Sequence, residues 1–550
     1  MSFIISNFAG SFGVFDLASR FSGVFMAHQG KVFRTIAAIE PKERQNWAYG
    51  GQEVKAGALS LFFAYRLPAF FYQGREADVL LDCREIFDNR QWGRNYQVQK
   101  EKDVLLVRFE KRDDHREVQK GEYSLWLAFA GASFDVKEEW VEQKGMFDEA
   151  RQSPPSSRWV FRLGKASGSF VMASAQGRDD AVKLAKSAWQ SRRRQEAELR
   201  EWAQKQCGGS DAALACARLS LASLHGPEGL YAGLPWFCQR WARDELISLR
   251  ALVLMGDAVL AKSIVLHHLS QIQPSGRLVG TMTRTIADAG WLFVRLLDFW
   301  PKLSKRERDF GIERLEYFVS ESERSLRGGL VMCNVDETWM DSILRGGARI
   351  EINALLLAAL RVLRVLKKKH PLEQQLKARV REAFLRKQRG GKGVYLADGA
   401  QDETIRPNVF IAAYVYPELL SKEEWISVFD FTLGRLWCEW GGLATIDRQD
   451  TGFVDAHSGE KPHSYHQGDS WFWINNLAAL VLARTDRKRY AKYIDAIVKA
   501  SAKEMREMGA IGHHAELSSA KELRSEGALA QSWSAAMFIE LCEELARKKS

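Results

Sequence analysis

Hydrophobic and polar positions alternate along the first third of the chain in a way that predicts β-strands. Short runs rich in β-branched and aromatic residues are separated by clusters of Gly, Asn, Asp and Lys. These runs span residues 58–67, 77–87, 103–111, 123–130, 158–163 and 168–174. Because a period of two buries one face of each strand, we expect an N-terminal antiparallel β-sandwich over residues 1–178.

From residue 179 onward the hydrophobic period becomes helical. Residues 179–209 begin with two aspartates and end at a Gly pair, which predicts a connecting helix. Apolar helical runs then recur over residues 210–550, at 211–224, 244–255, 257–269, 287–300, 351–366, 471–483 and 528–545. About a dozen helices joined by loops rich in Trp, Asp and Glu are typical of an (α/α)6 toroid. A helical solenoid is the alternative, but no repeated sequence period supports it.

Composition and charge exclude several classes of protein. The 550 residues carry a net charge of +10, but the basic residues lie on helix faces such as 186–205 and 361–370 rather than in one tract. We therefore expect no nucleic-acid partner. The chain shows no signal peptide and no apolar run near the ~18 residues of a membrane span. Its seven cysteines form no CxxC pair, so we expect a cytoplasmic protein with free thiols and no zinc site.

One segment, PWFCQRWARDEL at 235–246, concentrates the candidate chemistry. Trp236, Phe237 and Trp241 lie beside the adjacent pair Arg243 and Asp244, just before an apolar helix. Aromatic rings can cover the apolar face of a sugar while two charged groups hold its hydroxyls. The motif by itself is equally compatible with a structural ion pair under an aromatic lid.

Further carboxyl groups lie in loops beside tryptophans. The candidates in these later segments are Asp288, Trp339, Asp341, Glu351, His466, Gln467, Trp471 and Glu516. Glycoside hydrolysis needs one protonated carboxyl to donate to the leaving oxygen and one ionised carboxylate to act opposite it. Burial beside an indole can keep one acid protonated near neutral pH. For Glu351, a helix N-cap is the alternative interpretation.

The segments resemble, in the same order along the chain, the amylo-α-1,6-glucosidase domain of archaeal and bacterial glycogen debranching enzymes, which is related to glucoamylases. The matching segments are PWFCQRWARDELISL, ETWMDS followed by IEINALLLAAL, IRPNVFIAAY, GGLATIDRQDTGF, SYHQGDSWFW, and GAIGHHAELSS followed by GALAQSWSAAM. The sequence departs from the family pattern where Val409 replaces Gln and where Ala515 replaces the Pro before Glu516. Near the N-terminus, Phe21 and Ser22 stand where the family has Tyr-His.

The resemblance implies an inverting glycoside hydrolase acting on an α-glucan such as glycogen or a limit dextrin. It makes Asp341 the general acid and Glu516 the general base. Arg243 and Asp244 would hold the terminal glucose. The remaining candidates would bind the substrate. The first subsite would be walled by Trp236, Phe237, Trp241, Trp339 and Trp471, with polar contacts from His466 and Gln467, Asp288 at the rim, and Glu351 as a further substrate-binding residue. This chemistry would need no metal and no cofactor.

Two alternatives stay open at this point. The chain could be another inverting α-glucosidase of the glucoamylase or trehalase kind, although it has no trehalase-type PGGRF segment. It could also be a glycan-binding relative that has lost hydrolysis. Retention of both Asp341 and Glu516 favours the enzyme.

Overall fold

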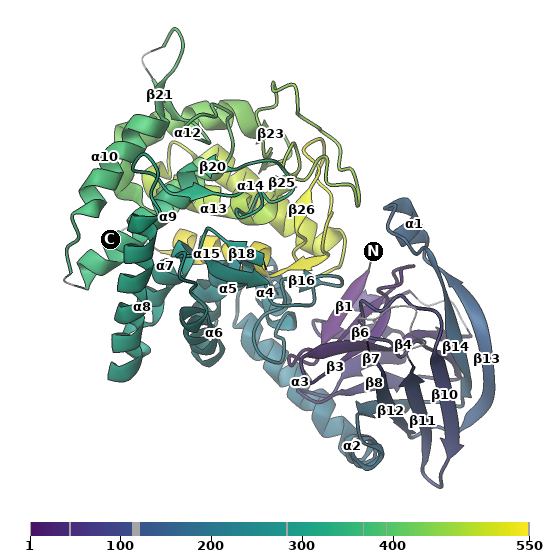
Figure 1. The fold of residues 1–550 in the computed structure, drawn as a ribbon. Helices are drawn as coiled ribbons and strands as arrows, with labels where there is room; N and C mark the ends of the chain where they lie inside the picture. Colours follow the sequence, from purple (N-terminus) through teal and green to yellow (C-terminus); the bar gives the residue numbers. More distant parts are fainter. Residues whose placement is uncertain are drawn as a thin grey trace. The chain divides into compact units, whose positions relative to one another are not determined.

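The computed structural model describes residues 2–42, 46–112, 121–281, 284–366, 368–391 and 393–547 (Figure 1). The chain divides into two compact units. Unit 1 comprises Met1–Cys238 with Arg506–His513, and unit 2 comprises Gln239–Met505 with His514–Ser550.

Unit 1 contains two large antiparallel sheets. The seven-stranded sheet has the order β1 (Phe3–Ser6), β2 (Phe12–Phe15), β3 (Gly23–His28), β4 (Lys31–Pro41), β9 (Ala77–Leu81), β14 (Ser157–Ala166) and β13 (Phe134–Lys144). The eight-stranded sheet has the order β10 (Arg94–Lys100), β11 (Val104–Lys111), β12 (Tyr123–Ala130), β15 (Phe170–Ala175), β8 (Ala69–Gln73), β7 (Leu59–Phe63), β6 (Glu53–Ala56) and β5 (Ala48–Tyr49).

The two sheets share one hydrophobic core. Val24 and Ile36 of the seven-stranded sheet belong to the same buried cluster as Phe70 and Leu127 of the eight-stranded sheet. Alternate side chains of each strand therefore point between the sheets, as the period of two predicts. The prediction of an N-terminal antiparallel β-structure is confirmed.

Three helices of unit 1 come after the strands of the two large sheets. They are α2 (Arg178–Gln190), α3 (Arg192–Cys207) and α4 (Ala212–Ser223). Where the sequence predicts one connecting helix, the structure has two, because Ser191 leaves the helical conformation with φ −95° and ψ 9°. The small buried face of α2, formed by Ala181, Ala185 and Ala188, fits its contact with β12 and β15. Gly208, in the left-handed region at φ 52°, ends α3.

Six helices of unit 2 form a closed cycle of contacts. They are α5 (Ala242–Leu254), α7 (Gly290–Phe299), α9 (Ile350–Val365), α11 (Asn408–Val415), α13 (Phe472–Asp486) and α15 (Ser532–Ala546). Each of them packs against the next, and α15 packs against α5. Every residue of α11 is buried, which is the property of a helix enclosed on all sides. The helical C-terminal part predicted from the sequence is confirmed.

The other helices of unit 2 are each buried on one face only. They are α6 (Ala258–Ser270), α8 (Lys305–Arg324), α10 (Leu372–Phe384), α12 (Lys422–Leu436) and α14 (Ala491–Glu507). Of these, α6, α8, α10 and α12 each contact a helix of the cycle. Ser304 and Ser421 form capping boxes that satisfy the first amide groups of α8 and α12.

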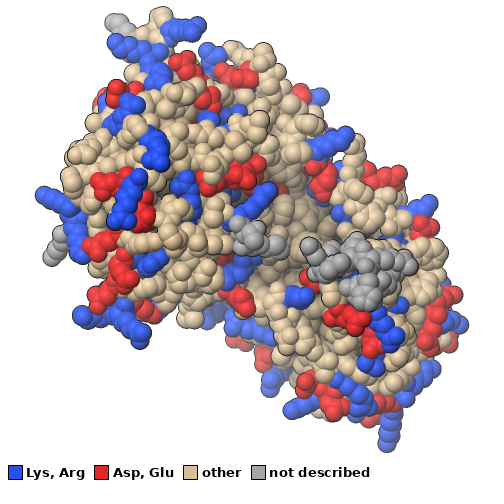
Figure 2. Space-filling model, in the orientation of Figure 1, with Lys and Arg blue, Asp and Glu red and all other residues tan. Residues whose placement is uncertain are grey.

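The surface shows no single basic tract on the face drawn in Figure 2, where Lys and Arg lie among Asp and Glu. Within the described ranges, no helix is long and apolar enough to cross a lipid bilayer.

Candidate active site

Arg243 and Asp244 lie in the first turn of α5, and each is 4% exposed. Each is held by a different side chain. The Arg243 Nε donates to Asp288 Oδ2 at 2.5 Å, whereas Asp244 Oδ1 accepts from Gln531 Nε2 at 2.7 Å. The pair is thus not a self-contained ion pair, because its hydrogen bonds lead to other loops of unit 2.

Asp341 lies beside this helix turn. Its Oδ2 is 3.8 Å from Arg243 Nη1, and its side chain remains 29% exposed. The loop that carries it joins β19 (Met332–Cys333) to β20 (Gly347–Ala348). Burial raises the pKa of Asp341, while the positive charges of Arg243 and Arg284 oppose that shift. The net rise favours the protonated acid.

Glu516 lies near Asp244. Burial raises the pKa of Asp244 to about 8, and the nearby charge of Glu516 contributes to the rise. Glu516 is 4% exposed and its Oε2 accepts from the Ala528 amide at 2.8 Å. Two carboxyl groups that are far apart in the sequence, Asp341 and Glu516, thus lie near the adjacent residues Arg243 and Asp244.

Aromatic rings surround Trp339, two residues before Asp341. The ring centroids of Trp471 and Trp473 lie 5.6 and 5.0 Å from that of Trp339, both edge to face. His466 stacks on Trp471 at 5.0 Å. Burial holds the pKa of His466 well below its usual range, so its ring is neutral. Its Nε2 is buried and makes no hydrogen bond among the described residues.

A buried network holds Trp339 from behind. Its Nε1 donates to Asn408 Oδ1 at 2.7 Å, and Asn408 Nδ2 donates to Asp398 Oδ1 at 2.7 Å. Arg345 then bonds both oxygens of Asp398 and both oxygens of Glu351. Glu351, which is 1% exposed, is thus occupied by Arg345 and is not an N-cap, since Arg349 occupies that position of α9.

The chain resembles known proteins in sequence and in fold. The sequence profile described as amylo-alpha-1,6-glucosidase matches residues 216–289 and 317–540, more than half of the chain. The chain belongs to the amylo-alpha-1,6-glucosidase family. It is therefore a glycoside hydrolase, and the resemblance stated from the sequence is confirmed. None of the curated proteins matches the sequence.

A solved structure shares the fold of this amylo-alpha-1,6-glucosidase family member. A bacterial glucoamylase complexed with acarbose superposes with a TM-score of 0.63 at 10% identity, covering 98% of this chain and 93% of that chain. A GH63 mannosylglycerate hydrolase from Thermus thermophilus in complex with Tris gives a TM-score of 0.45 at 14% identity, covering 59% and 98%.

Five residues in and around the candidate site were not predicted from the sequence. They are Gln531, Arg345, Asp398, Arg406 and Asn408. Arg406 donates to the His466 carbonyl at 2.6 Å and to Gln467 Oε1 at 2.9 Å, so it holds the loop of both predicted residues. Arg406, Asn408 and Gln531 lie in segments that resemble the family, which was the available signal.

Trp236 and Phe237 belong to unit 1, so their predicted place in the first subsite stays a prediction. The Trp236 ring lies 5.8 Å from the ring of Phe21 and 6.4 Å from that of Phe147. The guanidinium of Arg151 covers it at 3.9 Å. Trp236 is therefore a packed aromatic group of its own unit.

The adjacent histidines 513 and 514 do not form a metal site. His513 Nε2 contacts the Ile4 carbonyl oxygen at 2.9 Å, whereas His514 Nδ1 contacts Glu504 at 2.8 Å. Across the described ranges, no group of three or more His, Cys, Asp or Glu side chains is arranged to hold a metal ion.

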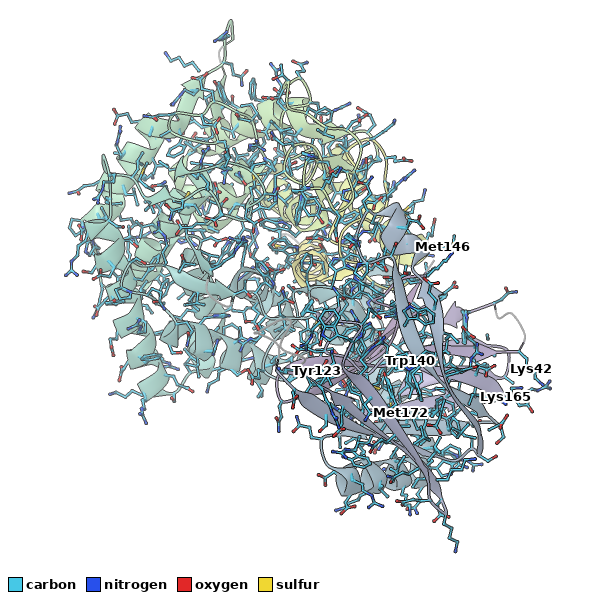
Figure 3. The ribbon with its side chains drawn as sticks, turned by 45° about the vertical axis from the view of Figure 1, so that its right-hand side comes forward. Lys42, Tyr123, Trp140, Met146, Lys165 and Met172 are labelled. Carbon is cyan, nitrogen blue, oxygen red and sulfur yellow. The ribbon has the colours of Figure 1, made fainter. Side chains whose placement is uncertain are left out.

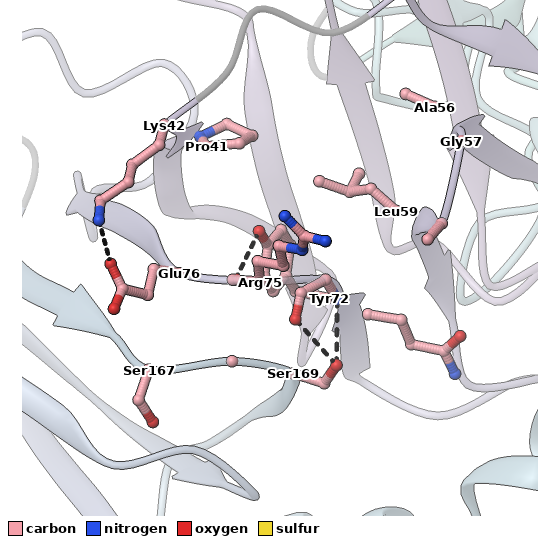
Figure 4. A pocket seen from close by; sticks show the side chains of 14 residues that line it. Pro41, Lys42, Ala56, Gly57, Leu59, Tyr72, Arg75, Glu76, Ser167 and Ser169 are labelled. Atoms are coloured by element: carbon pink, nitrogen blue, oxygen red, sulfur yellow. Dashed lines mark hydrogen bonds and ion pairs between the residues drawn. The ribbon is translucent and has the colours of Figure 1, made fainter.

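A large hollow lies at one end of the sheets of unit 1 and contains none of the predicted site residues (Figure 4). Its volume is about 980 Å³, and Lys42 and Glu76 form an ion pair of 2.7 Å at its edge. Figure 3 places Lys42 and Lys165 at this end of the unit. The residues predicted to be catalytic, Asp341 and Glu516, lie in unit 2, so we assign this hollow no catalytic role.

Proposed function

We propose that this protein hydrolyses α-1,6-linked glucose at the branch points of a glycogen-type α-glucan, with inversion at the anomeric carbon. The observation that supports the proposal is the helix turn of Arg243 and Asp244, since Asp341 lies 3.8 Å from Arg243 and the charge of Glu516 acts on Asp244. Inverting hydrolysis needs two such carboxyl groups, about 6.5 to 9.5 Å apart, with a sugar and a water between them.

Asp341 is the general acid of this mechanism. It donates its proton to the glycosidic oxygen as the bond to the anomeric carbon breaks. Its raised pKa supports this role, because the group must hold a proton before the reaction. The leaving chain departs as an alcohol, and Asp341 is left ionised.

Glu516 is the general base. It takes a proton from a water that attacks the anomeric carbon from the opposite face, so the product has inverted configuration. Exchange of protons with solvent then restores Asp341 and Glu516. The hydrogen bond from the Ala528 amide fixes the direction of the Glu516 carboxylate.

The terminal glucose lies, in this proposal, between the helix turn of Arg243 and Asp244 and a wall of aromatic side chains. Arg243 and Asp244 hold its hydroxyl groups, and Asp288 orients Arg243. The ring of the sugar packs on the indoles, and His466 Nε2 and Gln467 add polar contacts. We assign the wall to Trp241, Trp339 and Trp471.

An (α/α)6 toroid would bring these loops to one end of the helices. The closed cycle of α5, α7, α9, α11, α13 and α15 supports that architecture. We propose that the catalytic domain begins near residue 210, since the family match starts at residue 216, and that 179–209 connects it to the domain of residues 1–178. We further propose a cytoplasmic enzyme that needs no cofactor.

Glucose release tests the proposed function. A phosphorylase limit dextrin, isomaltose, maltose and trehalose are compared as substrates, and the anomer first released is followed by NMR. We expect β-glucose from the limit dextrin, with little from the α-1,4-linked maltose or from trehalose. Preference for maltose would replace the proposal with a glucoamylase-type activity, and binding without release would make the protein a glycan-binding relative.

A further inference from the structure

The turn that precedes Glu516 is held by a buried carboxylate on α14. Glu504 is fully buried and receives three hydrogen bonds. His514 Nδ1 lies 2.8 Å from its Oε2, and the Ala515 amide and the Ser525 hydroxyl donate to its Oε1 at 3.3 and 2.5 Å. One side chain thus binds the two residues immediately before Glu516 and a residue on the facing segment.

The orientation of His514 follows from its other neighbours. Asn476 Oδ1 accepts from Ser501 Oγ at 3.0 Å, so its amide nitrogen faces His514 Nε2 at 3.2 Å. With Nε2 accepting that hydrogen bond, the Nδ1 proton of His514 is donated to Glu504. All three polar contacts of Glu504 are therefore donors to its carboxylate.

Ala515 contributes the amide that makes this arrangement possible. The family segments that this one resembles have proline before the glutamate, and proline has no amide hydrogen and a fixed φ. In this chain the covalent restraint of a proline ring is absent, and the Ala515 amide donates to Glu504 instead. The hydrogen bond restrains the same backbone position by different means.

The facing segment completes the support of Glu516. The Glu516 amide donates to the Ala528 carbonyl, and Glu516 Oε2 accepts from the Ala528 amide, each at 2.8 Å. Because Ser525 belongs to that segment, Glu504 fixes both sides of the hairpin that carries the carboxylate. We propose that Glu504 is a positioning residue that fixes the direction of the general base Glu516, an inference that rests on the function proposed above.

The consequence is specific to the chemical step. Glu504 contacts neither Arg243 nor Asp244, the residues proposed to hold glucose, among the hydrogen bonds of the described residues. Loss of its contacts should leave substrate binding nearly unchanged and misplace the base relative to the attacking water. Misplacement of a reacting group by about 1 Å can cost about 10²-fold in rate.

Three variants and one control test the proposal on the limit dextrin. Glu504→Ala should lower kcat about 10²-fold with KM within about threefold of wild type. Glu504→Gln keeps an oxygen for Ala515 and Ser525 but turns an amide nitrogen toward the His514 Nδ1 proton, so it should recover only part of the rate. Ser525→Ala, at a partly exposed position, should lower kcat by a smaller factor without changing KM.

Glu373→Ala is the matched control. Glu373 is also a buried glutamate of unit 2, bound by Arg364 and Tyr416, but it lies on α10 away from the hairpin. It should lower Tm while kcat of the folded enzyme stays near wild type. Equal kcat in wild type and all three test variants, or a rise in KM with no fall in kcat, would overturn the positioning role. Glu516→Gln separates the two ideas, since an active Glu516→Gln variant would reject the proposed base itself.

Discussion

The carboxyl groups of the candidate site differ in what surrounds them. Asp244 is buried and accepts a hydrogen bond from the neutral amide of Gln531, while Asp341 keeps part of its surface and faces Arg243. Burial raises the pKa of both acids, because the protein solvates their charges less well than water. Environment, rather than residue type, thus favours the protonated form of Asp341.

Substitution of the two reacting carboxyls is the most direct residue-level prediction. Asp341→Asn and Glu516→Gln should each lower kcat on a limit dextrin by about 10² to 10⁴-fold, because each removes a proton donor or acceptor and preserves shape. Oligosaccharide binding measured by calorimetry should persist. Near wild-type turnover in either variant would contradict the role of that residue.

Asp244 should link stability to pH in the opposite sense from most acids. Its pKa is about 8 in the folded protein, well above the ~3.9 of an unfolded aspartate, so the folded state binds more protons between these values. Stability from this group is full below about pH 4 and is lost as pH rises toward about 8.

Asp244→Asn should remove that loss. The Tm of the variant minus the Tm of wild type should be larger at about pH 8 than at about pH 5. Its kcat/KM should fall by about one to two decades for every substrate. Thermal unfolding at both pH values, together with kinetics on two substrates, checks it. A Tm difference that does not change with pH would count against the raised pKa.

At the scale of elements, the hairpin of residues 516–528 depends on one glycine. Gly527 has φ +67°, and a Cβ built on it would lie 2.2 Å from Glu516 Oε2. A side chain at this position would therefore push the carboxylate out of place in addition to straining the backbone.

Gly527→Ala should lower kcat more than the control Gly256→Ala. Gly256 also has a positive φ, +86°, but a Cβ there meets nothing within 4 Å. Both variants should lose about 1 kcal/mol of unfolding free energy through backbone strain, yet only Gly527→Ala should be impaired in turnover. Equal kcat in the two folded variants would show that the hairpin tolerates the added carbon.

At the scale of the whole molecule, both units bury acids among arginines. Ion pairs and hydrogen bonds from Arg345 hold the pKa of Asp398 at about 2, and those from Arg90 hold the pKa of Asp88 at about 2, despite the opposing effect of burial. The folded-state pKa values lie below the unfolded value of ~3.9. Their stabilisation is present above about pH 4 and lost as pH falls toward about 2.

Acid should therefore unfold the protein steeply between about pH 4 and about pH 2. Urea midpoints at pH values of about 7, 4 and 3 measure it, and Asp398→Asn should flatten the dependence on pH for unit 2. The control Asp309→Asn, on the exposed part of α8 beside Lys305, should leave the dependence unchanged. A flat acid profile in the wild type would contradict the depressed pKa values.

The sequence by itself determined the properties that depend on neighbouring residues. Alternation predicts the strands of unit 1 and apolar runs predict the inner helices, because burial of one face or of all faces imposes those periods. The adjacency of Arg243 and Asp244 and the order of the family segments are equally local. These features were enough to predict the family and the two classes of secondary structure.

Tertiary structure alone decided the partners. Asp288 and Gln531, which are distant in sequence, bind Arg243 and Asp244. The carboxylate of Glu351 is bound by Arg345. Their roles, like the pKa of Asp244, arise from burial and from contacts between segments far apart in the chain. No local pattern encodes such contacts, because desolvation and charge depend on what the folded chain places around each group.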